Sequence, residues 1–159
     1  MIILGVDPGS HATGYGVIDT GPVVRMVAGG VIRTPAGAPL SERLLTIHEE
    51  LTAVIAAHAP MQMAVEDLFN AKNARSSLVL GHARGVILLA GARAGLAVSE
   101  YAPREVKQAL TGNGAATKEQ VRFMVMRLLG LGQEPPLDLS DALAVALAHK
   151  GRSRMRGLG

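Results

Sequence analysis

The spacing of apolar and polar residues predicts strands near the start of the chain. An almost continuous apolar run over residues 2–6 stops at Asp7, as expected of a buried strand that delivers Asp7 to an edge of a sheet. Apolar runs over residues 15–18 and 23–32 predict two more strands, joined by a turn rich in turn-forming residues. We expect these three strands to be antiparallel.

The remainder of the chain alternates predicted helices with two further strands. Apolar residues at helical spacing, with charged residues between them, predict helices over residues 39–58, 77–94, 103–110, 117–128 and 138–148. Short apolar runs predict strands over residues 61–65 and 97–101. A Thr-x-x-Gln capping box at Thr117 supports one helix start. The chain therefore predicts an α/β domain over residues 1–150, followed by a flexible basic tail over residues 151–159 that carries three arginines.

The amino-acid composition excludes some classes of function but does not identify a single one. The 159 residues fit one compact domain, and 48% hydrophobic residues allow a sizeable core. A net charge of +3 is compatible with a polyanionic partner, although the excess is small. The absence of cysteine excludes disulfides and thiolate chemistry. With neither a signal-peptide pattern nor an apolar run of about 20 residues, we expect a cytoplasmic protein without membrane contact.

Four carboxylates fall at the ends of predicted elements. Asp7 and Glu66 each end a buried strand, while Asp138 and Asp141 are spaced i,i+3 at the start of the last helix and share one face of it. If that helix packs across the strand ends, the four acids converge and need a cation. Oxygen ligands alone favour Mg²⁺, with Mn²⁺ as the alternative. Two such ions can activate water and stabilise the leaving oxygen in phosphodiester hydrolysis.

Each acid also has a purely structural interpretation. Asp7 before Pro-Gly can start a turn. Asp138 can cap its helix, and Asp141 can be a first-turn acid that the helix dipole favours. Glu66, followed by Asp67, can be an exposed strand end. Spacing alone does not show that the four meet, so both interpretations stay open.

Several short motifs together resemble the RuvC family of junction resolvases. In chain order they are GVDPGS and TGYG at residues 5–16, AVE with Phe69 and AKNA at 64–74, GHARG at 81–85, EYAP and VKQ at 100–108, and DLSDA at 138–142. The resemblance runs from Met1 to about His149 and so covers nearly the whole chain.

This resemblance implies a ribonuclease-H-like fold, with a central mixed five-stranded sheet flanked by helices. It also implies a homodimer that makes paired, symmetric cuts in four-way (Holliday) DNA junctions during recombination and repair. Two metal ions in each active site would be held by the four acids Asp7, Glu66, Asp138 and Asp141. A branch-migration motor of RuvA and RuvB is the implied protein partner.

The resemblance further implies a set of DNA contacts, at Phe69, Lys72, Asn73, Lys107 and Lys118. Phe69 falls where the family presents an aromatic near the junction crossover, where a ring can stack on an unpaired base. Its alternative is a loop side chain folded back on the core. The lysines would neutralise phosphates, although a lone lysine is usually a solvated surface charge. Asn70 and Arg75 lie in the same loop without a matching family residue.

Three rival functions remain at this point. A phosphotransferase of the sugar-kinase and actin-like type begins with a similar strand, Asp and glycine-rich turn, but needs two such domains, for which the chain is too short. A nuclease of related fold that acts on RNA is a closer rival. A junction-binding module without activity is the third, and the four intact acids argue against it.

Overall fold

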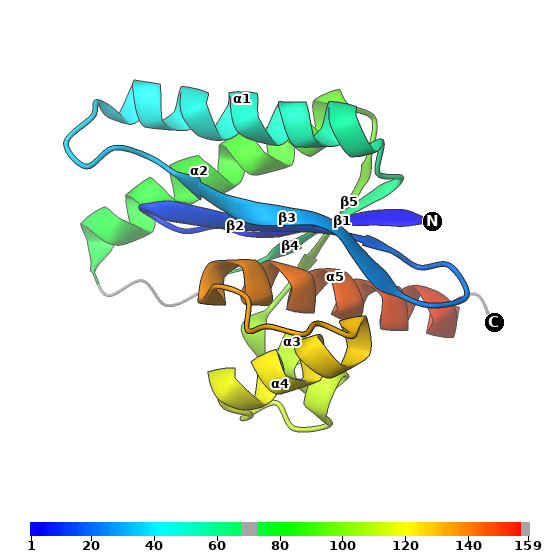
Figure 1. Cartoon of the computed structure of the whole chain (residues 1–159). Helices are drawn as coiled ribbons and strands as arrows, with labels where there is room; N and C mark the ends of the chain where they lie inside the picture. The colour runs from blue at the N-terminus through cyan, green and yellow to red at the C-terminus, as the bar shows by residue number, and fades with distance from the viewer. Residues whose placement is uncertain (68–72, 157–159) are drawn as a thin grey trace.

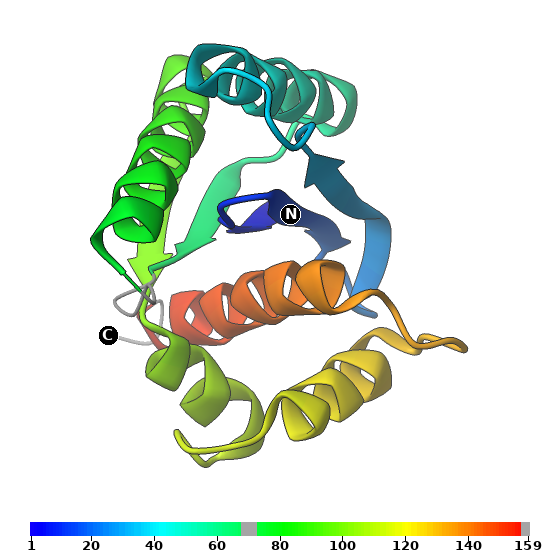
Figure 2. The same cartoon turned by 90° about the vertical axis from the view of Figure 1, so that its left-hand side faces the viewer.

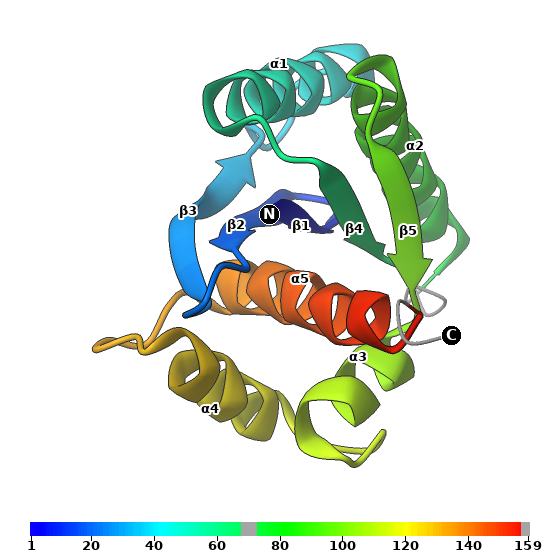
Figure 3. The ribbon, with the colours of Figure 1, turned by 90° about the vertical axis from the view of Figure 1, so that its right-hand side faces the viewer.

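The computed structural model describes residues 1–67 and 73–156, the last three of these by their backbone alone. One mixed sheet forms its centre, with the strands β1 (Ile2–Asp7), β2 (Ala12–Asp19), β3 (Arg25–Arg33), β4 (Gln62–Glu66) and β5 (Ala97–Tyr101). Their order in the sheet is β3-β2-β1-β4-β5 (Figure 3). The first three strands are antiparallel neighbours, while β4 runs parallel to β1 and β5 parallel to β4. The predicted mixed five-stranded sheet is confirmed.

Helices cover both faces of the sheet (Figures 1 and 2). On one face lie α1 (Leu40–His58) and α2 (Ala74–Arg93), and on the other lies α5 (Leu137–Arg156). Two further helices, α3 (Pro103–Thr111) and α4 (Lys118–Leu129), pack on the outer side of α5. A separate apolar core fills each side of the sheet. No helix in the described part of the chain is long and apolar enough to cross a bilayer.

Local signals in the sequence set several helix ends. The Thr117 hydroxyl accepts a hydrogen bond from the Gln120 amide at 3.2 Å, which confirms the predicted capping box. Gly112 ends α3 in the left-handed conformation that glycine adopts without strain. One boundary differs from the expectation. The helix predicted to end at residue 148 continues through Arg156, so the predicted end of this helix was wrong.

Glycines let α5 approach the sheet closely. A Cβ atom on Gly14 of β2 would lie 1.9 Å from the carbonyl oxygen of Asp138, and one on Gly5 of β1 would lie 2.2 Å from that of Ala142. Real Cβ atoms do not come that near to backbone atoms, so only glycine fits at these two positions. Because these two residues have no side chain, the first turns of α5 can lie directly against β1 and the start of β2.

A buried hydrogen-bonded chain ties the other end of α5 to the sheet. The Tyr101 hydroxyl lies 2.7 Å from Nδ1 of His149, whose Nε2 lies 2.7 Å from the Gln62 side-chain oxygen. Tyr101 and His149 are both buried. These contacts join α5 to β5 and β4, and so help to hold the helix along the sheet.

We expect Tyr101→Phe to lower the free energy of unfolding by about 1–3 kcal/mol, because it deletes one member of a buried hydrogen bond. Chemical denaturation measures this loss. Tyr15→Phe is the matched control, since the Tyr15 hydroxyl makes no hydrogen bond within the described part of the chain. Equal losses in the two variants would show that the Tyr101 hydroxyl contributes nothing specific.

Candidate active site

The four predicted acids line a single cavity of about 260 Å³. Asp7 ends β1 and is buried, and Glu66 ends the neighbouring parallel strand β4, one residue beyond the pair Val6–Val65. Asp138 and Asp141 come from the first turns of α5, which crosses these strand ends. The structure thus brings the four acids together. Their service as metal ligands stays a prediction.

The neighbouring acid Asp67 belongs to a different contact. Its carboxylate lies 3.4 Å from the Arg84 guanidinium of α2, and Arg84 also pairs with Glu100 at the exposed side of β5. Successive side chains at a strand end point to opposite faces of the sheet. Glu66 therefore lines the acid cavity, whereas Asp67 joins an ion-pair network on the α2 face.

Burial and mutual repulsion disfavour charge on these acids. Burial, the hydrogen bond shared with Glu66 and the nearby negative charges raise the pKa of Asp7 from its ordinary value of 3.8 to about 10. Burial also raises the pKa values of Glu66 and Asp141, although Lys118 opposes the rise in both. A site that penalises the charge of its own carboxylates in this way favours a bound cation.

Two lysines and an apolar wall complete the cavity. Lys107 of α3 and Lys118 of α4 both line it, and Nζ of Lys118 lies 3.8 Å from a carboxylate oxygen of Asp141. The Lys118 side chain is 65% exposed, so this ion pair adds little stability and leaves the ammonium group accessible. Val106 and Val121 form part of the wall. The sequence did not identify these valines as site residues, because buried apolar positions on α3 and α4 read as ordinary core.

The chemistry of the donors fits a divalent cation. The cavity presents carboxylate oxygens and neither thiolate nor imidazole, which is the ligand set of Mg²⁺ or Mn²⁺. Within residues 1–67 and 73–156, no three acidic or histidine side chains already stand where they could hold one ion together. Asp7 and Glu66 share a hydrogen bond, and Asp141 faces Lys118. Small side-chain rotations would be needed to turn these oxygens toward a common ion.

The other predicted DNA contacts divide into two groups. Phe69 and Lys72 lie outside the described residues, as does Asn70. Asn73 caps α2, its side-chain oxygen accepting a hydrogen bond from the Ser76 amide at 2.9 Å. This contact gives Asn73 a structural role that the sequence interpretation did not assign. Arg75, left without a role, is exposed in the first turn of the same helix.

Comparison with known proteins identifies the family. The family model described as crossover junction endodeoxyribonuclease RuvC matches residues 3–149. The chain belongs to the RuvC family. A RuvC protein of Ectopseudomonas mendocina is 52% identical over 149 residues, which cover 93% of this chain and 85% of the relative. A RuvC protein of Halorhodospira halophila is 50% identical over 147 residues, covering 92% of this chain and 88% of the relative.

Solved structures agree with this assignment. The RuvC protein of Thermus thermophilus, determined in complex with a Holliday junction substrate, matches with a TM-score of 0.93 and 38% identity, over 98% of this chain and 96% of that one. The yeast mitochondrial Holliday junction resolvase Ydc2 matches with a TM-score of 0.66 over 98% of this chain and 83% of its own, at 10% identity, which shows a shared fold alone. The ribonuclease-H-like fold predicted from the motifs is confirmed.

Proposed function

We propose that this chain is a metal-dependent endonuclease that resolves four-way DNA junctions in recombination and repair. The observation that carries the proposal is the acid cavity, where four carboxylates from β1, β4 and α5 meet beside two lysines in a member of the RuvC family. The acids are separated by up to 134 positions in the chain, from Asp7 to Asp141, and meet through folding alone.

Each group in the cavity has a part in phosphodiester hydrolysis. Asp7, Glu66, Asp138 and Asp141 would hold two Mg²⁺ ions, with Mn²⁺ as the alternative. When bound, the ions lower the pKa of water and neutralise charge on the leaving oxygen. Lys107 and Lys118 bind the phosphate backbone of the strand and orient it. The valines beside them limit the access of bulk water. The net reaction adds water to phosphorus and breaks one P–O bond.

The test compares cleavage of a synthetic four-way junction with cleavage of linear duplex, single-stranded DNA and RNA of the same sequences. We expect Mg²⁺-dependent paired nicks that yield two nicked duplexes, and little cleavage of the other substrates. EDTA should stop the reaction. Equal cleavage of linear duplex or RNA would contradict junction resolution. Binding of the junction without cleavage would favour a junction-binding module without catalytic activity.

The remaining predicted contacts belong to the same proposal. Phe69 near the crossover would stack on a base that loses its partner, and Lys72 and Asn73 would contact the nearby backbone. A branch-migration motor of RuvA and RuvB would deliver the junction. Because the substrate is cellular DNA, we infer that the chain works in the cytoplasm.

Two symmetric cuts require two active sites related by a twofold axis. The outward face of α2 supports a dimer through this helix. Leu78 and Leu89 are 67% and 52% exposed there, and Gly81 and Gly85 between them face open space. Small residues between two leucines allow a second helix to approach closely.

We expect Leu89→Lys to weaken the dimer more than 100-fold. Burying a leucine side chain contributes about 1.5–3 kcal/mol, and a twofold interface contains the residue twice. Sedimentation across a range of concentrations measures the effect. Leu45→Lys on α1, where the leucine is 54% exposed, is the matched control and should leave the dimer intact. A wild-type chain that is monomeric both alone and on a junction would contradict the dimer.

A further inference from the structure

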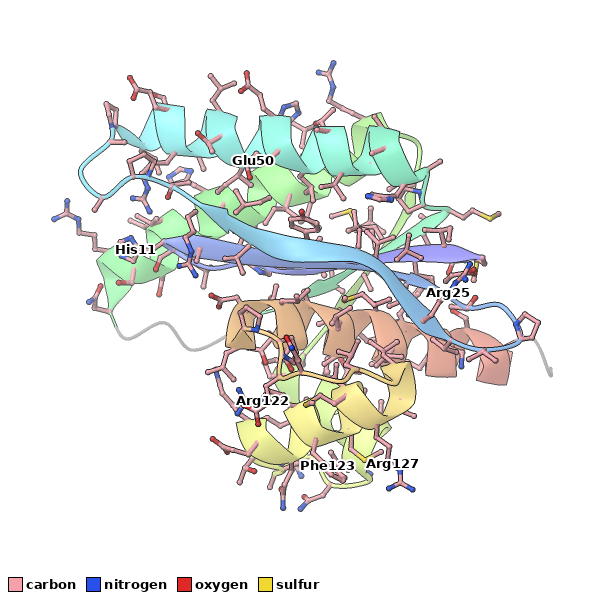
Figure 4. All side chains as sticks on the ribbon, in the orientation of Figure 1. His11, Arg25, Glu50, Arg122, Phe123 and Arg127 are labelled. Atoms are coloured by element: carbon pink, nitrogen blue, oxygen red, sulfur yellow. The ribbon has the colours of Figure 1, made fainter. Side chains whose placement is uncertain are left out.

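Another cavity is lined in part by the turn that follows β1. It measures about 290 Å³ and is lined by Ser10, His11, Arg43, Arg75, Ser76 and Val79. We call it the basic pocket, because its lining combines two guanidinium groups and an imidazole with no carboxylate. Figure 4 shows His11 at the edge of the molecule where α2 begins. Neither the four acids nor the predicted DNA contacts belong to this pocket.

The basic pocket and the acid cavity share one short turn. Asp7, Pro8 and Gly9 line the acid cavity, and the next two residues, Ser10 and His11, line the basic pocket. Two residues of extended chain span at most about 7 Å. Phosphates of one DNA strand follow one another about every 3.4 Å along the helix axis. When one phosphate of a DNA strand lies in the acid cavity, another phosphate a few nucleotides along the same strand can therefore reach the basic pocket.

Arg43 is held in a fixed position in the pocket. Its Nε donates to the Thr34 hydroxyl at 3.2 Å, and a terminal nitrogen donates to the carbonyl oxygen of Ser10. These bonds use two of about five N–H donors on a guanidinium group, and the others remain to bind a ligand. Because Arg43 in α1 is bonded to the turn itself, its charge stays next to the active site.

Arg75 lines the pocket from a different helix, α2. It lies in the first turn of α2, which Asn73 caps, so the positive end of the helix dipole adds to its charge. Planar guanidinium groups match the geometry of phosphate oxygens. The hydroxyls of Ser10 and Ser76 and the imidazole of His11 supply further donors around the same space. These donors suit a phosphodiester more than a carboxylate metabolite. The reason is that the pocket opens at the surface beside the proposed site of strand cleavage.

We propose that the basic pocket binds a backbone phosphate of the strand that is cut, within a few nucleotides of the cleaved bond. This inference rests on the proposed function and adds a binding subsite to it. Such a contact fixes the register of the strand without reading its bases. The pocket would thereby hold the strand in place while the acid cavity acts on the bond.

The first measurement is junction binding without divalent metal, over a series of salt concentrations. Each phosphate contact contributes about 0.9 to the slope of log affinity against log salt on duplex DNA. We expect Arg75→Gln to reduce the slope by about 1 for each pocket engaged and to weaken binding about 3- to 30-fold at moderate salt. Arg93→Gln, in the last turn of the same helix, is the matched control and should change neither quantity.

The second measurement locates the phosphate. Junctions with one neutral methylphosphonate linkage at each position around the cut are bound by the wild type and by Arg75→Gln. The wild type should lose affinity at one position where the variant loses none, because its contact there is already gone. Equal losses for both proteins at every position would overturn the inference while leaving junction binding intact. A wild type that binds no junction at all would overturn the proposed function together with it.

Discussion

Asp7→Asn should reduce junction cleavage by at least 1,000-fold while leaving junction binding within a few fold of the wild type. Asp7 is 8% exposed, lies beside three other acids, and shares a hydrogen bond with Glu66. Asparagine keeps the shape of the side chain but removes the charge that a divalent cation needs. The loss corresponds to about 4 kcal/mol of barrier, at roughly 1.4 kcal/mol for each factor of ten.

Single-turnover cleavage and metal-free binding of the same labelled junction measure the two effects separately. Asp67→Asn is the matched control, because Asp67 is the neighbouring carboxylate that pairs with Arg84 outside the acid cavity. This control should cleave at close to the wild-type rate. An Asp7→Asn variant that keeps a tenth of the wild-type rate would show that Asp7 is not a central metal ligand.

The raised pKa of Asp7 also predicts how the stability of the folded chain changes with pH. The pKa of Asp7 is raised in the folded chain, so the folded state holds the proton more tightly than the unfolded state does. Without divalent metal, the contribution of Asp7 is therefore complete below about pH 4 and is lost as the pH rises toward the folded-state pKa. The unfolding free energy of wild type minus that of Asp7→Asn should fall across this window, and saturating Mg²⁺ should reverse the fall. A rising difference in metal-free buffer would contradict the buried, repelled carboxylate.

Gly14→Ala should lower cleavage about 100-fold although Gly14 carries no chemical group. Its Cβ would lie 1.9 Å from the Asp138 carbonyl oxygen and 2.5 Å from the Asp138 carbonyl carbon. Backbone atoms cannot rotate away as a side chain does, so the first turn of α5 must move off the sheet. A misplacement of about 1 Å can cost a factor of 100 in rate. Overpacking of this kind also costs roughly 1–3 kcal/mol of stability.

Gly151→Ala in the same helix is the matched control. A Cβ at Gly151 meets no atom within 4 Å, and alanine is the better helix former by about 1 kcal/mol. The control should therefore be at least as stable as the wild type and cleave normally. Cleavage is compared for folded protein, at temperatures well below each melting transition. Normal cleavage and stability in Gly14→Ala would show that the close approach of α5 does not position its acids.

Local patterns along the chain were enough to predict most helices and strands and to single out four candidate acids. The apolar run that stops at Asp7, the helical spacing from residue 39, and the capping box at Thr117 each act over a few neighbouring residues. For that reason they could be read without the fold. The family motifs added the expected ribonuclease-H-like fold and the expected metal-binding role of the four acids. The end of α5 was misjudged, since arginines and serines favour a tail and a helix almost equally.

Which of these residues contact one another depends on how distant segments pack. Apolar spacing alone does not show that Glu66 and Asp67 have different surroundings. In the fold, Glu66 lines the acid cavity and Asp67 contacts Arg84. The basic pocket joins the turn after β1 to the starts of α1 and α2, whose residues Arg43 and Arg75 are 32 positions apart. The TGYG motif does not by itself indicate that Gly14 lies against the backbone of α5. These contacts depend on the packing of distant segments, which periodicity and capping do not encode.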